Sequence, residues 1–431
     1  MVKSMSAIIA TAERPLFGGD CLARERGAPH GKVLLVPGLI PGEVALVEIV
    51  LSRRNYDRAR VLSVLEPSPH RVQPPCPYHA ICGGCAMLHV EGQFQVELGR
   101  QVLEDIFLRE GLEVPPIQAV TEASLGYRCR MQLTNGGLQG RGGGREVVPI
   151  TACPCATPEI NRWLEQVPPE QRQSGRLQVF GDRRVCGEGK VLWALTQRED
   201  KGPRVTGRSR RRLTDKVRRR FCGTLPSPET TCTLTLSPPG FRPKEISFDV
   251  RGFFQSNLAV LEKAISLVLE HTKVISATSP QSTPSHALDL YSGAGTMAAF
   301  LSDHFDLVTL VEHNRDSLVF AGQNLKGRPH QSYGVSAARW AGEFGPALLK
   351  DRPPELAFID PPRSGMERAV QDFLAASPIP HIAYLSCDPA PQARDCRALR
   401  EGGYHMKRLF LLDFYPNTGH LETLALLERP R

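Results

Sequence analysis

The stretch Ala287-Leu-Asp-Leu-Tyr-Ser-Gly-Ala-Gly-Thr296 reads as a buried strand that runs into a glycine turn and then a helix. Gly293 and Gly295 permit a tight turn and let a ligand approach the backbone, although a purely structural turn is the alternative. About twenty residues later another apolar strand ends in Val311-Glu312, where a carboxylate can accept hydrogen bonds from both ribose hydroxyls of a nucleoside. The stretch lacks a complete G-x-G-x-x-G sequence and a cradle for a pyrophosphate. It therefore favours S-adenosylmethionine over NAD.

Further apolar strands at 287–291, 307–311, 356–359 and 381–386 alternate with helical segments, which predicts a doubly wound parallel sheet. Such sheets bind ligands at the carboxyl ends of their strands. Asp360, in Asp-Pro-Pro-Arg363, follows one of these strands, and Cys387 follows another. A cysteine at this edge can be an accessible nucleophile, and the alternative is an inert buried thiol. Glu422 opens a C-terminal strand, so we expect it at the strand entrance rather than in the core, as a general base or only a strand cap.

The rest of the chain divides into two further regions. Short strands at 33–36, 43–51 and 58–65, separated by glycine and proline turns, predict a small barrel of the OB type over residues 1–66. A cysteine-rich loop, a helix over 94–110 and an irregular β-rich segment predict a central domain over 67–247. The α/β domain then covers 248–431.

Charge and cysteine content limit the classes of function. The 431 residues carry 53 Lys and Arg against 45 Asp and Glu, a net charge of +8. The segment 198–220 alone holds nine Arg and two Lys against three acidic residues, so the excess positive charge is local and suits an acidic partner such as a nucleic acid. No export signal or stretch long enough to span a bilayer is evident, which predicts a cytoplasmic protein with no membrane partner.

Thiols stay reduced in the cytoplasm, so clustered cysteines are better read as metal ligands or catalysts than as disulfides. Cys76, Cys82 and Cys85 have the spacing C-x5-C-x2-C. With a fourth, distant ligand, this spacing suits a tetrahedral zinc ion and a [4Fe-4S] cluster equally. The C-x3-C-x2-C signature of radical S-adenosylmethionine chemistry is absent.

Five motifs occur in the order and spacing of the RNA uracil-C5 methyltransferase family, which the chain resembles over nearly its whole length. They are Phe253-Phe-Gln-Ser-Asn257, the loop at 289–296, Asp360-Pro-Pro-Arg363, Ser386-Cys-Asp-Pro389 and His420-Leu-Glu-Thr423. The N-terminal segment resembles the family's TRAM domain, an OB-like RNA-binding module. The cysteine loop resembles the iron–sulfur motif of its ribosomal-RNA branch.

The resemblance implies a fold, an activity and a set of functional residues. It implies a Rossmann-like S-adenosylmethionine methyltransferase domain that methylates carbon 5 of a uridine in RNA, ribosomal RNA of the 23S type being the expected substrate, with the protein acting as a monomer. Cys387 would be the nucleophile and Glu422 the base. The residues implied around S-adenosylmethionine are Gln255, Tyr291, Thr296, Glu312 and Asp360. A [4Fe-4S] cluster would be held by Cys76, Cys82, Cys85 and Cys153.

Two departures and several alternatives stay open at this point. Asp388 stands where the family usually has asparagine, which places an extra negative charge beside the thiol. Cys155 competes with Cys153 as the fourth ligand. Other possible functions are a transfer-RNA uridine methyltransferase, an RNA cytosine-C5 methyltransferase and a non-catalytic RNA-binding metalloprotein. The cytosine enzymes commonly need a second cysteine in a Pro-Cys motif, which the 360–363 position lacks.

Overall fold

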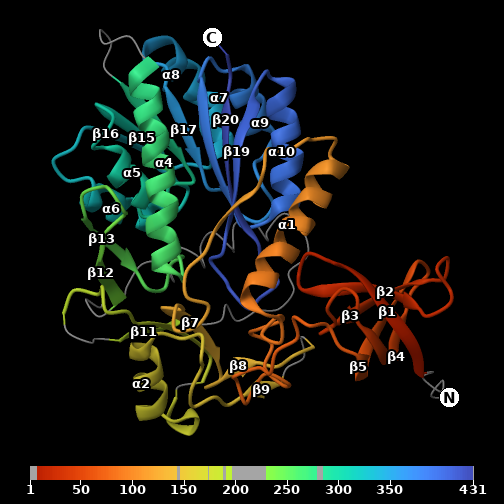
Figure 1. The fold of residues 1–431 in the computed structure, drawn as a ribbon. Coiled ribbons are helices and arrows are strands. Elements are labelled where there is room, and N and C mark those ends of the chain that lie inside the picture. The colour runs from red at the N-terminus through yellow and green to blue at the C-terminus, as the bar shows by residue number, and fades with distance from the viewer. Residues whose placement is uncertain are drawn as a thin grey trace, which may run out of the picture.

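The computed structural model describes residues 7–142, 146–172, 174–187, 191–196, 230–278 and 285–430. The basic segment 198–220 lies outside the described residues. Figure 1 shows an N-terminal barrel, small sheets in the middle of the chain and a large C-terminal sheet flanked by helices.

The N-terminal strands close into a five-stranded barrel in the order β1-β2-β3-β5-β4, with β1 pairing to both β2 and β4. The strands are β1 (Ala7–Pro15), β2 (Asp20–Glu25), β3 (Val33–Pro37), β4 (Val44–Ser52) and β5 (Tyr56–Glu66). Small side chains such as Ala10, Ala23 and Ala45 alternate with larger ones in the barrel interior. A barrel of five strands is too narrow to hold a large side chain at every inward-facing position. Closure leaves no free strand edge here. The expected OB-like barrel is thus confirmed.

Within its described residues, the central region carries two helices, a short 3₁₀ turn and small antiparallel sheets. Its elements are α1 (Gly92–Arg109), β6 (Gln118–Val120), β7 (Arg130–Thr134), β8 (Leu138–Gln139), β9 (Val147–Val148), α2 (Pro158–Gln166), η1 (Pro169–Gln171), β10 (Arg176–Phe180), β11 (Leu192–Thr196), β12 (Thr231–Leu236) and β13 (Lys244–Asp249). Strands β11-β10-β7 form one sheet, β12-β13 a second and β8-β9 a third. This arrangement agrees with the β-rich segment expected from the sequence.

The C-terminal region is an eight-stranded sheet in the order β16-β15-β14-β17-β18-β20-β19-β6. Its elements are α4 (Leu258–Thr278), β14 (His286–Leu290), α5 (Thr296–Leu301), β15 (Leu307–Val311), α6 (Arg315–Asn324), β16 (His330–Tyr333), α7 (Ala337–Glu343), α8 (Gly345–Asp351), β17 (Leu356–Ile359), α9 (Arg368–Ala376), β18 (His381–Ser386), α10 (Pro389–Glu401), β19 (His405–Leu412) and β20 (Glu422–Glu428). The strands β14 to β18 are parallel, whereas β20 runs antiparallel to both β18 and β19. The strand order changes direction between β14 and β17, because β15 and β16 lie on one side of β14 whereas β17 and β18 lie on the other. An open α/β sheet binds its ligand at the carboxyl ends of the strands beside such a point.

Three strands of this sheet are absent from the sequence-based expectation, namely β16, β19 and β6. β16 is a half-exposed polar segment, and its hydropathy does not distinguish it from a loop. β6 comes from the central region and pairs in parallel with β19, so a segment distant in sequence covers the sheet edge.

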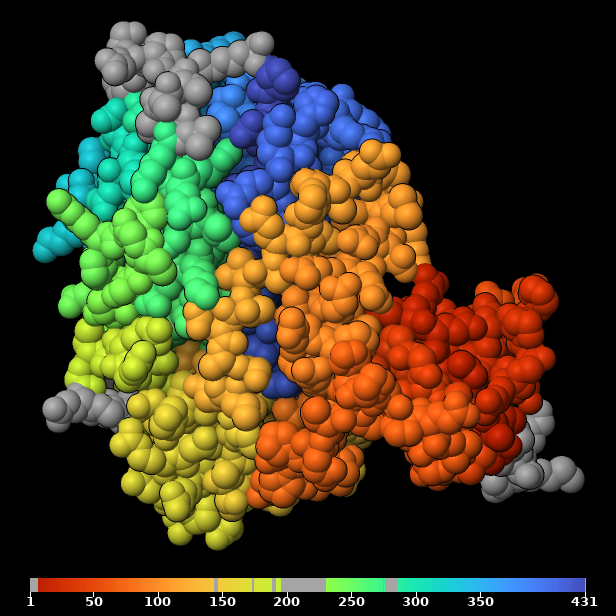
Figure 2. All heavy atoms as spheres, in the orientation of Figure 1, coloured from red at the N-terminus to blue at the C-terminus, as the bar shows by residue number. Residues whose placement is uncertain are grey.

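The barrel stands to one side and meets the rest of the chain through α1 and the cysteine loop (Figure 2). Ile40 of the barrel, Val90 of the loop and Leu98 of α1 form a small apolar cluster there. Arg14 of β1 also pairs with Asp105 of α1 at 2.8 Å. None of the helices in the described parts of the chain is long and apolar enough to cross a bilayer.

Candidate active site and cysteine-lined site

The functional candidates of the C-terminal region gather along one edge of the sheet. The carboxyl ends of β14, β15, β17 and β18 lie there together with the start of β20, which runs in the opposite direction. The candidates that follow or begin these strands are Tyr291, Glu312, Asp360, Cys387 and Glu422. The topology therefore brings together side chains that the sequence spreads over more than a quarter of its length.

The glycine loop after β14 is a strained and specifically held turn. Tyr291 and Gly295 have positive φ values of 63° and 72°. A Cβ atom at Gly295 would lie 2.8 Å from Cβ of Ala321, so only glycine allows α5 and α6 to pack this closely. The backbone N–H of Gly293 donates a hydrogen bond to Oε2 of Glu312 at 3.1 Å. Glu312 thus shapes the loop while its oxygens keep further lone pairs for a ligand.

Buried polar atoms without partners indicate that this edge is built for a polar ligand. Within the described residues, Oε1 of Gln255, Oδ1 of Asp289 and Oγ of Ser292 are buried and accept or donate no hydrogen bond. An orphaned buried polar atom costs roughly 1–3 kcal/mol, so such atoms are expected where a ligand supplies the missing bonds. Asp289 and Ser292 flank the glycine loop, and this fits a nucleoside with several donors.

The other residues expected around the cofactor lie in three different parts of the C-terminal region. Thr296 is the first residue of α5 and is half-buried. The hydroxyl of Tyr291 donates a hydrogen bond to Glu367, just before α9. Gln255 lies in the loop before α4, where its backbone carbonyl accepts a bond from the Cys129 thiol at 3.6 Å. No described contact joins Gln255 to the strand-end residues.

The register of β18 and β20 places Cys387 opposite Glu422. Ser386 pairs with Thr423, so the residues that follow β18 and open β20 continue the same antiparallel ladder. The side chain of Gln392 in α10 ties the two strands together by donating to the carbonyl of Tyr384 at 3.0 Å and accepting from Thr423 at 2.5 Å. A half-buried thiol therefore faces a carboxylate at the end of the sheet.

Glu422 corrects one expectation from the sequence. It does open β20, but its side chain is buried, with 3% of its surface exposed, whereas we expected it outside the core. β20 lies between β18 and β19, and Glu422 pairs with Leu412, so neighbouring strands flank it on both sides. Burial, and then the charge of Asp360, raises the pKa of Glu422 to about 8, and Arg363 opposes the shift.

Electrostatics around the thiol favour its neutral form in the resting protein. Burial, followed by the charges of Glu422 and Asp360, raises the pKa of Cys387 to about 11, with Arg363 again acting in the opposite direction. Burial alone raises the pKa of Asp360 to about 7. Asp388, the unusual residue beside the thiol, serves as the N-cap of α10 and accepts from the N–H of Ala390 at 3.1 Å. Asparagine would cap a helix equally well.

Two functional contributors escaped the sequence analysis. Arg363 is the last residue of the Asp360-Pro-Pro-Arg363 motif. That its charge lowers the pKa values of Cys387 and Glu422 follows only from the fold. Asp395 of α10 is fully buried and accepts hydrogen bonds from the N–H of Met366 at 2.8 Å and the hydroxyl of Tyr384 at 2.7 Å. It thereby fixes the turn that follows Asp360. No sequence signal marks it, because a single acidic residue in a helix normally faces water.

Five cysteines line one pocket between the cysteine loop and the central sheet. They are Cys76, Cys82, Cys85, Cys153 and Cys155. The sulfur atoms of Cys85 and Cys155 lie 3.8 Å apart. Arg141 holds the loop by donating to the carbonyls of His79 at 2.9 Å and Cys85 at 2.8 Å.

The spacing of these sulfurs bears on which metal would fit. A tetrahedral zinc ion with Zn–S bonds of 2.3 Å requires its sulfurs to be about 3.8 Å apart. Among the described residues, no three cysteine sulfurs all lie within 4.8 Å of one another. The donor set is therefore cysteine-rich, as a cluster requires, and wider than a closed zinc site.

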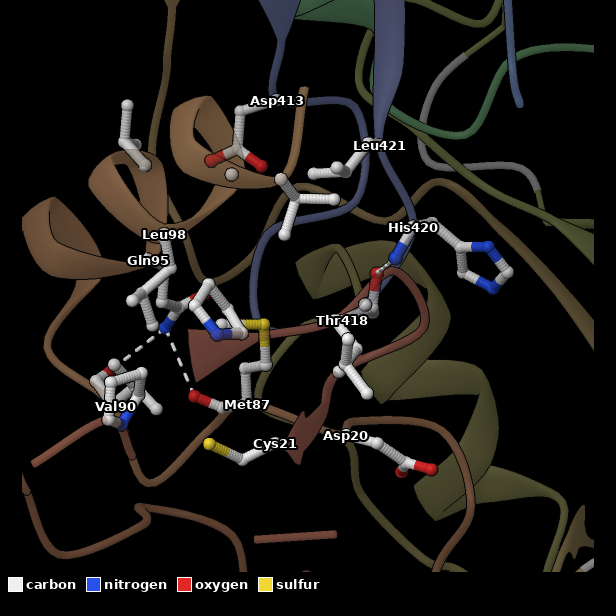
Figure 3. Close-up of a pocket in the computed structure, with 18 of the residues that line it drawn as sticks. Asp20, Cys21, Met87, Val90, Gln95, Leu98, Asp413, Thr418, His420 and Leu421 are labelled. Atoms are coloured by element: carbon white, nitrogen blue, oxygen red, sulfur yellow. Dashed lines mark hydrogen bonds between the residues drawn. The ribbon is translucent and has the colours of Figure 1, made fainter. Parts of the chain in front are cut away.

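An apolar cavity lies behind the loop that carries Glu422. It is lined by the barrel, the cysteine loop, α1 and the 413–421 loop (Figure 3). Gln95 of α1 donates to the carbonyls of Val90 at 2.8 Å and Met87 at 3.2 Å. In Figure 3, His420 points away from the other labelled side chains. The three regions of the chain therefore meet next to the candidate base.

Comparisons with known proteins agree with this geometry. A sequence model of the tRNA (uracil-5-)-methyltransferase family matches residues 244–430. The chain is 28% identical to an uncharacterized RNA methyltransferase of Treponema denticola, over 99% of this chain and 100% of that relative. It is 29% identical to the 23S rRNA (uracil(1939)-C(5))-methyltransferase RlmD of Halomonas elongata, over 93% of this chain and 86% of the relative. A solved structure, the tRNA (uracil-54, C5)-methyltransferase of Pyrococcus abyssi with S-adenosyl-L-homocysteine, has the same fold, with a TM-score of 0.65 at 21% identity over 97% of this chain and 99% of that one.

Proposed function

The chain belongs to the RNA uracil-C5 methyltransferase family, and from this premise we propose that it methylates carbon 5 of a uridine in 23S ribosomal RNA. The observation that carries the proposal is the thiol of Cys387 facing the buried carboxylate of Glu422 at the end of the sheet. Relatives named for 23S rRNA, matched over most of their length, support the substrate. We propose that the protein acts as a monomer.

S-adenosylmethionine, when bound, supplies an electrophilic methyl group. The orphaned atoms of Asp289 and Ser292 support a polar ligand at the glycine loop. We propose that Gln255, Tyr291, Thr296, Glu312 and Asp360 hold it, with Glu312 accepting from the ribose hydroxyls.

Cys387 makes carbon 5 of uracil reactive. That carbon is a poor nucleophile, but a thiolate adding to carbon 6 converts the ring into an enolate with electron density at carbon 5. The Cys387 thiol must first lose its proton, and its raised pKa makes this step unfavourable in the resting protein, although the positive charge of Arg363 lowers the cost. The target uridine must leave its stack to reach the sheet edge, so an unpaired or loop uridine is the preferred substrate.

Glu422 completes the reaction by removing a proton. Once carbon 5 carries the methyl group, its hydrogen must leave before the carbon–sulfur bond to Cys387 can break. A carboxylate with a pKa near 8 is a stronger base than an ordinary glutamate, and it lies across the ladder from the thiol. Proton removal by Glu422 then lets Cys387 depart by β-elimination, which restores the aromatic ring.

Trapping a covalent complex on RNA that contains 5-fluorouridine tests this function. The wild-type protein should form a stable adduct, since fluorine cannot leave carbon 5 as a proton does. Cys387→Ala should bind the same RNA and form none. Cys396→Ala, which removes a buried thiol of α10, is the matched control and should still form the adduct. Absence of an adduct with a folded wild-type protein would contradict the covalent mechanism.

The choice of RNA is tested by mapping methylated nucleosides in a strain that lacks the gene. We expect 5-methyluridine to disappear from one position of 23S rRNA and to remain in transfer RNA. Loss from transfer RNA alone would establish the alternative substrate. Loss of 5-methylcytosine would establish the cytosine alternative.

We further propose that Cys76, Cys82, Cys85 and Cys153 hold a [4Fe-4S] cluster that orders the central region for RNA binding. The convergence of these cysteines on one pocket and their wide spacing support a cluster over zinc. Protein purified with its metal should be brown and contain iron, and Cys82→Ser should lose both properties. Comparing Cys153→Ser with Cys155→Ser identifies the fourth ligand, because only loss of the true ligand lowers the iron content. Zinc without iron in the wild type would contradict the cluster.

A further inference from the structure

Two histidines and a glutamate meet at the end of the C-terminal sheet opposite to Cys387. His381 opens β18 and Glu428 closes β20, and the two are direct partners in the antiparallel register. Cross-strand partners project to the same face of a sheet. His271 reaches them from α4, which packs on that face.

The ligating atoms of these side chains form a compact group. One nitrogen of each histidine and a carboxylate oxygen all lie within 4.8 Å of one another. The closest described approach between His381 and Glu428 joins Nδ1 and Oε1 at 4.0 Å. The two imidazole rings are 5.1 Å apart between centroids and nearly perpendicular, at 77°. Rotation of the side chains would bring the atoms to the separation of about 3.3 Å that tetrahedral Zn–N and Zn–O bonds require.

His271 supplies an independent sign that a ligand is missing. Its side chain is 92% buried, with 8% of its surface exposed, and within the described residues its Nε2 has no hydrogen-bond partner. Burial, followed by the charge of His381, lowers the pKa of His271 to about 4. The imidazole is therefore neutral at physiological pH, and a neutral ring nitrogen is the form that binds a metal. Glu428 is the opposing nearby charge, whereas Arg408, whose guanidinium donates to Gln118 at 2.9 Å, lowers the pKa of His271 further.

We propose that His271, His381 and Glu428 bind a divalent zinc ion, with a water molecule as the fourth ligand. Two imidazoles and one carboxylate form a recognised ligand set for zinc, and all three stand on rigid elements of the sheet and its covering helix. The site lies at the amino end of β18, whereas Cys387 follows its carboxyl end. The ion would join α4 to β18 and β20 and stabilise the sheet without taking part in methyl transfer.

The test compares the zinc content and melting temperature of wild type and His271→Ala after zinc addition and removal of the excess. The wild type should hold one more zinc per chain than the variant, and this difference is independent of zinc at the five cysteines. At zinc concentrations about 100-fold above the dissociation constant, the melting temperature of the wild type should rise by roughly 5 °C, and that of His271→Ala should not. His30→Ala, which removes an exposed histidine of the barrel, is the control and should behave like wild type.

Glu428→Gln serves if the alanine variant does not fold, since it preserves the size of the side chain and removes its charge. It should lower zinc affinity at least tenfold. X-ray absorption of the extra ion should show nitrogen and oxygen neighbours only. Equal zinc content and equal thermal shifts in wild type and both variants, or sulfur around the extra ion, would overturn the proposal.

Discussion

At the scale of single residues, the candidate active site is a concentration of carboxylates around one thiol. Asp289, Asp360 and Glu422 are all buried or nearly so, and each pKa is raised chiefly by burial. Arg363 is the positive charge that acts on both Cys387 and Glu422. A group of ionisable side chains whose pKa values are shifted by burial and by one another marks this edge as a functional site.

Glu422→Gln is expected to stop the reaction after methyl transfer. The amide cannot remove the proton from carbon 5, so methylated RNA should stay bonded to Cys387 and turnover should fall by about 10²–10⁴-fold. Denaturing gel electrophoresis with methyl-labelled RNA measures the adduct. Glu401→Gln, at the exposed end of α10, should turn over normally. Normal turnover by Glu422→Gln would remove Glu422 as the base.

The raised pKa of Glu422 also predicts how activity and stability change with pH. Proton removal needs the carboxylate, so turnover should increase with pH and reach half its maximum near pH 8. Stability should change in the opposite direction. The folded protein binds the proton up to about pH 8 and the unfolded chain only to about 4.5, so the stabilising contribution of the protonated form is lost as pH rises through this range. Glu422→Gln should therefore melt higher than wild type at pH 8, and by a larger margin than at pH 5.

At the scale of elements, the loop between β19 and β20 determines where Glu422 lies. Asn417 in this loop is buried and has a positive φ of 66°. Its N–H donates to Oε1 of Gln95 in α1 at 2.9 Å, and its Nδ2 donates to the carbonyl of Ser124 at 2.7 Å. Its own carbonyl accepts from the N–H of Met87 in the cysteine loop at 3.0 Å. The loop is thus fixed from two directions by the central region.

Asn417→Ala should lower both stability and turnover. Alanine tolerates positive φ poorly, and it loses the side-chain bonds to the carbonyl of Ser124 and from Nε2 of Gln95, so we expect a loss of about 2–3 kcal/mol, measured by chemical denaturation. Turnover should fall because Glu422 is no longer held opposite Cys387. Asn417→Gly relieves the backbone strain and should recover part of the stability only. Asn135→Ala is the matched control, since Asn135 also has positive φ (48°) and bonds Gly175 but lies in a turn of the central sheet. Equal turnover in Asn417→Ala and wild type would show that the loop does not position the base.

At the scale of the whole molecule, the barrel touches the loop that carries Glu422. The N–H of Gly18, in the turn between β1 and β2, donates to the carbonyl of Gly419 at 3.1 Å. A Cβ atom at Gly419 would lie 2.0 Å from the carbonyl carbon of Gly18, which no side chain can accommodate. We infer that the position of the barrel depends on two glycines meeting backbone to backbone.

Gly419→Ala should therefore displace the barrel from the sheet. RNA contacts of the barrel and the catalytic edge would no longer be aligned, and we expect affinity for substrate RNA to weaken about tenfold, which corresponds to about 1.4 kcal/mol. Fluorescence titration measures the affinity, and small-angle scattering measures the displacement. Gly92→Ala, at the start of α1, meets nothing within 4 Å and should leave both unchanged. Unaltered affinity and shape in Gly419→Ala would contradict the inferred dependence.

The local elements and the order of the motifs can be predicted from the amino-acid sequence. The bounds of β15, β17 and β18 agree with the apolar stretches read from the sequence, because strands buried on both faces appear as continuous apolar runs. The glycine turn after β14 could also be predicted from the sequence. A residue with positive φ that lies against a neighbouring helix is almost always glycine. The barrel followed from short alternating strands.

Which of these elements contact one another, and which side chains they bury, follows from the folded structure alone. The burial of Glu422, the joining of β6 to the sheet edge, and the meeting of His271 with His381 and Glu428 each depend on segments far apart in the chain. Hydropathy periodicity reports the two faces of one element, whereas burial and pKa depend on which other element covers that face. Contacts between segments far apart in the chain determine burial and pKa, and a short window of the sequence does not contain those contacts.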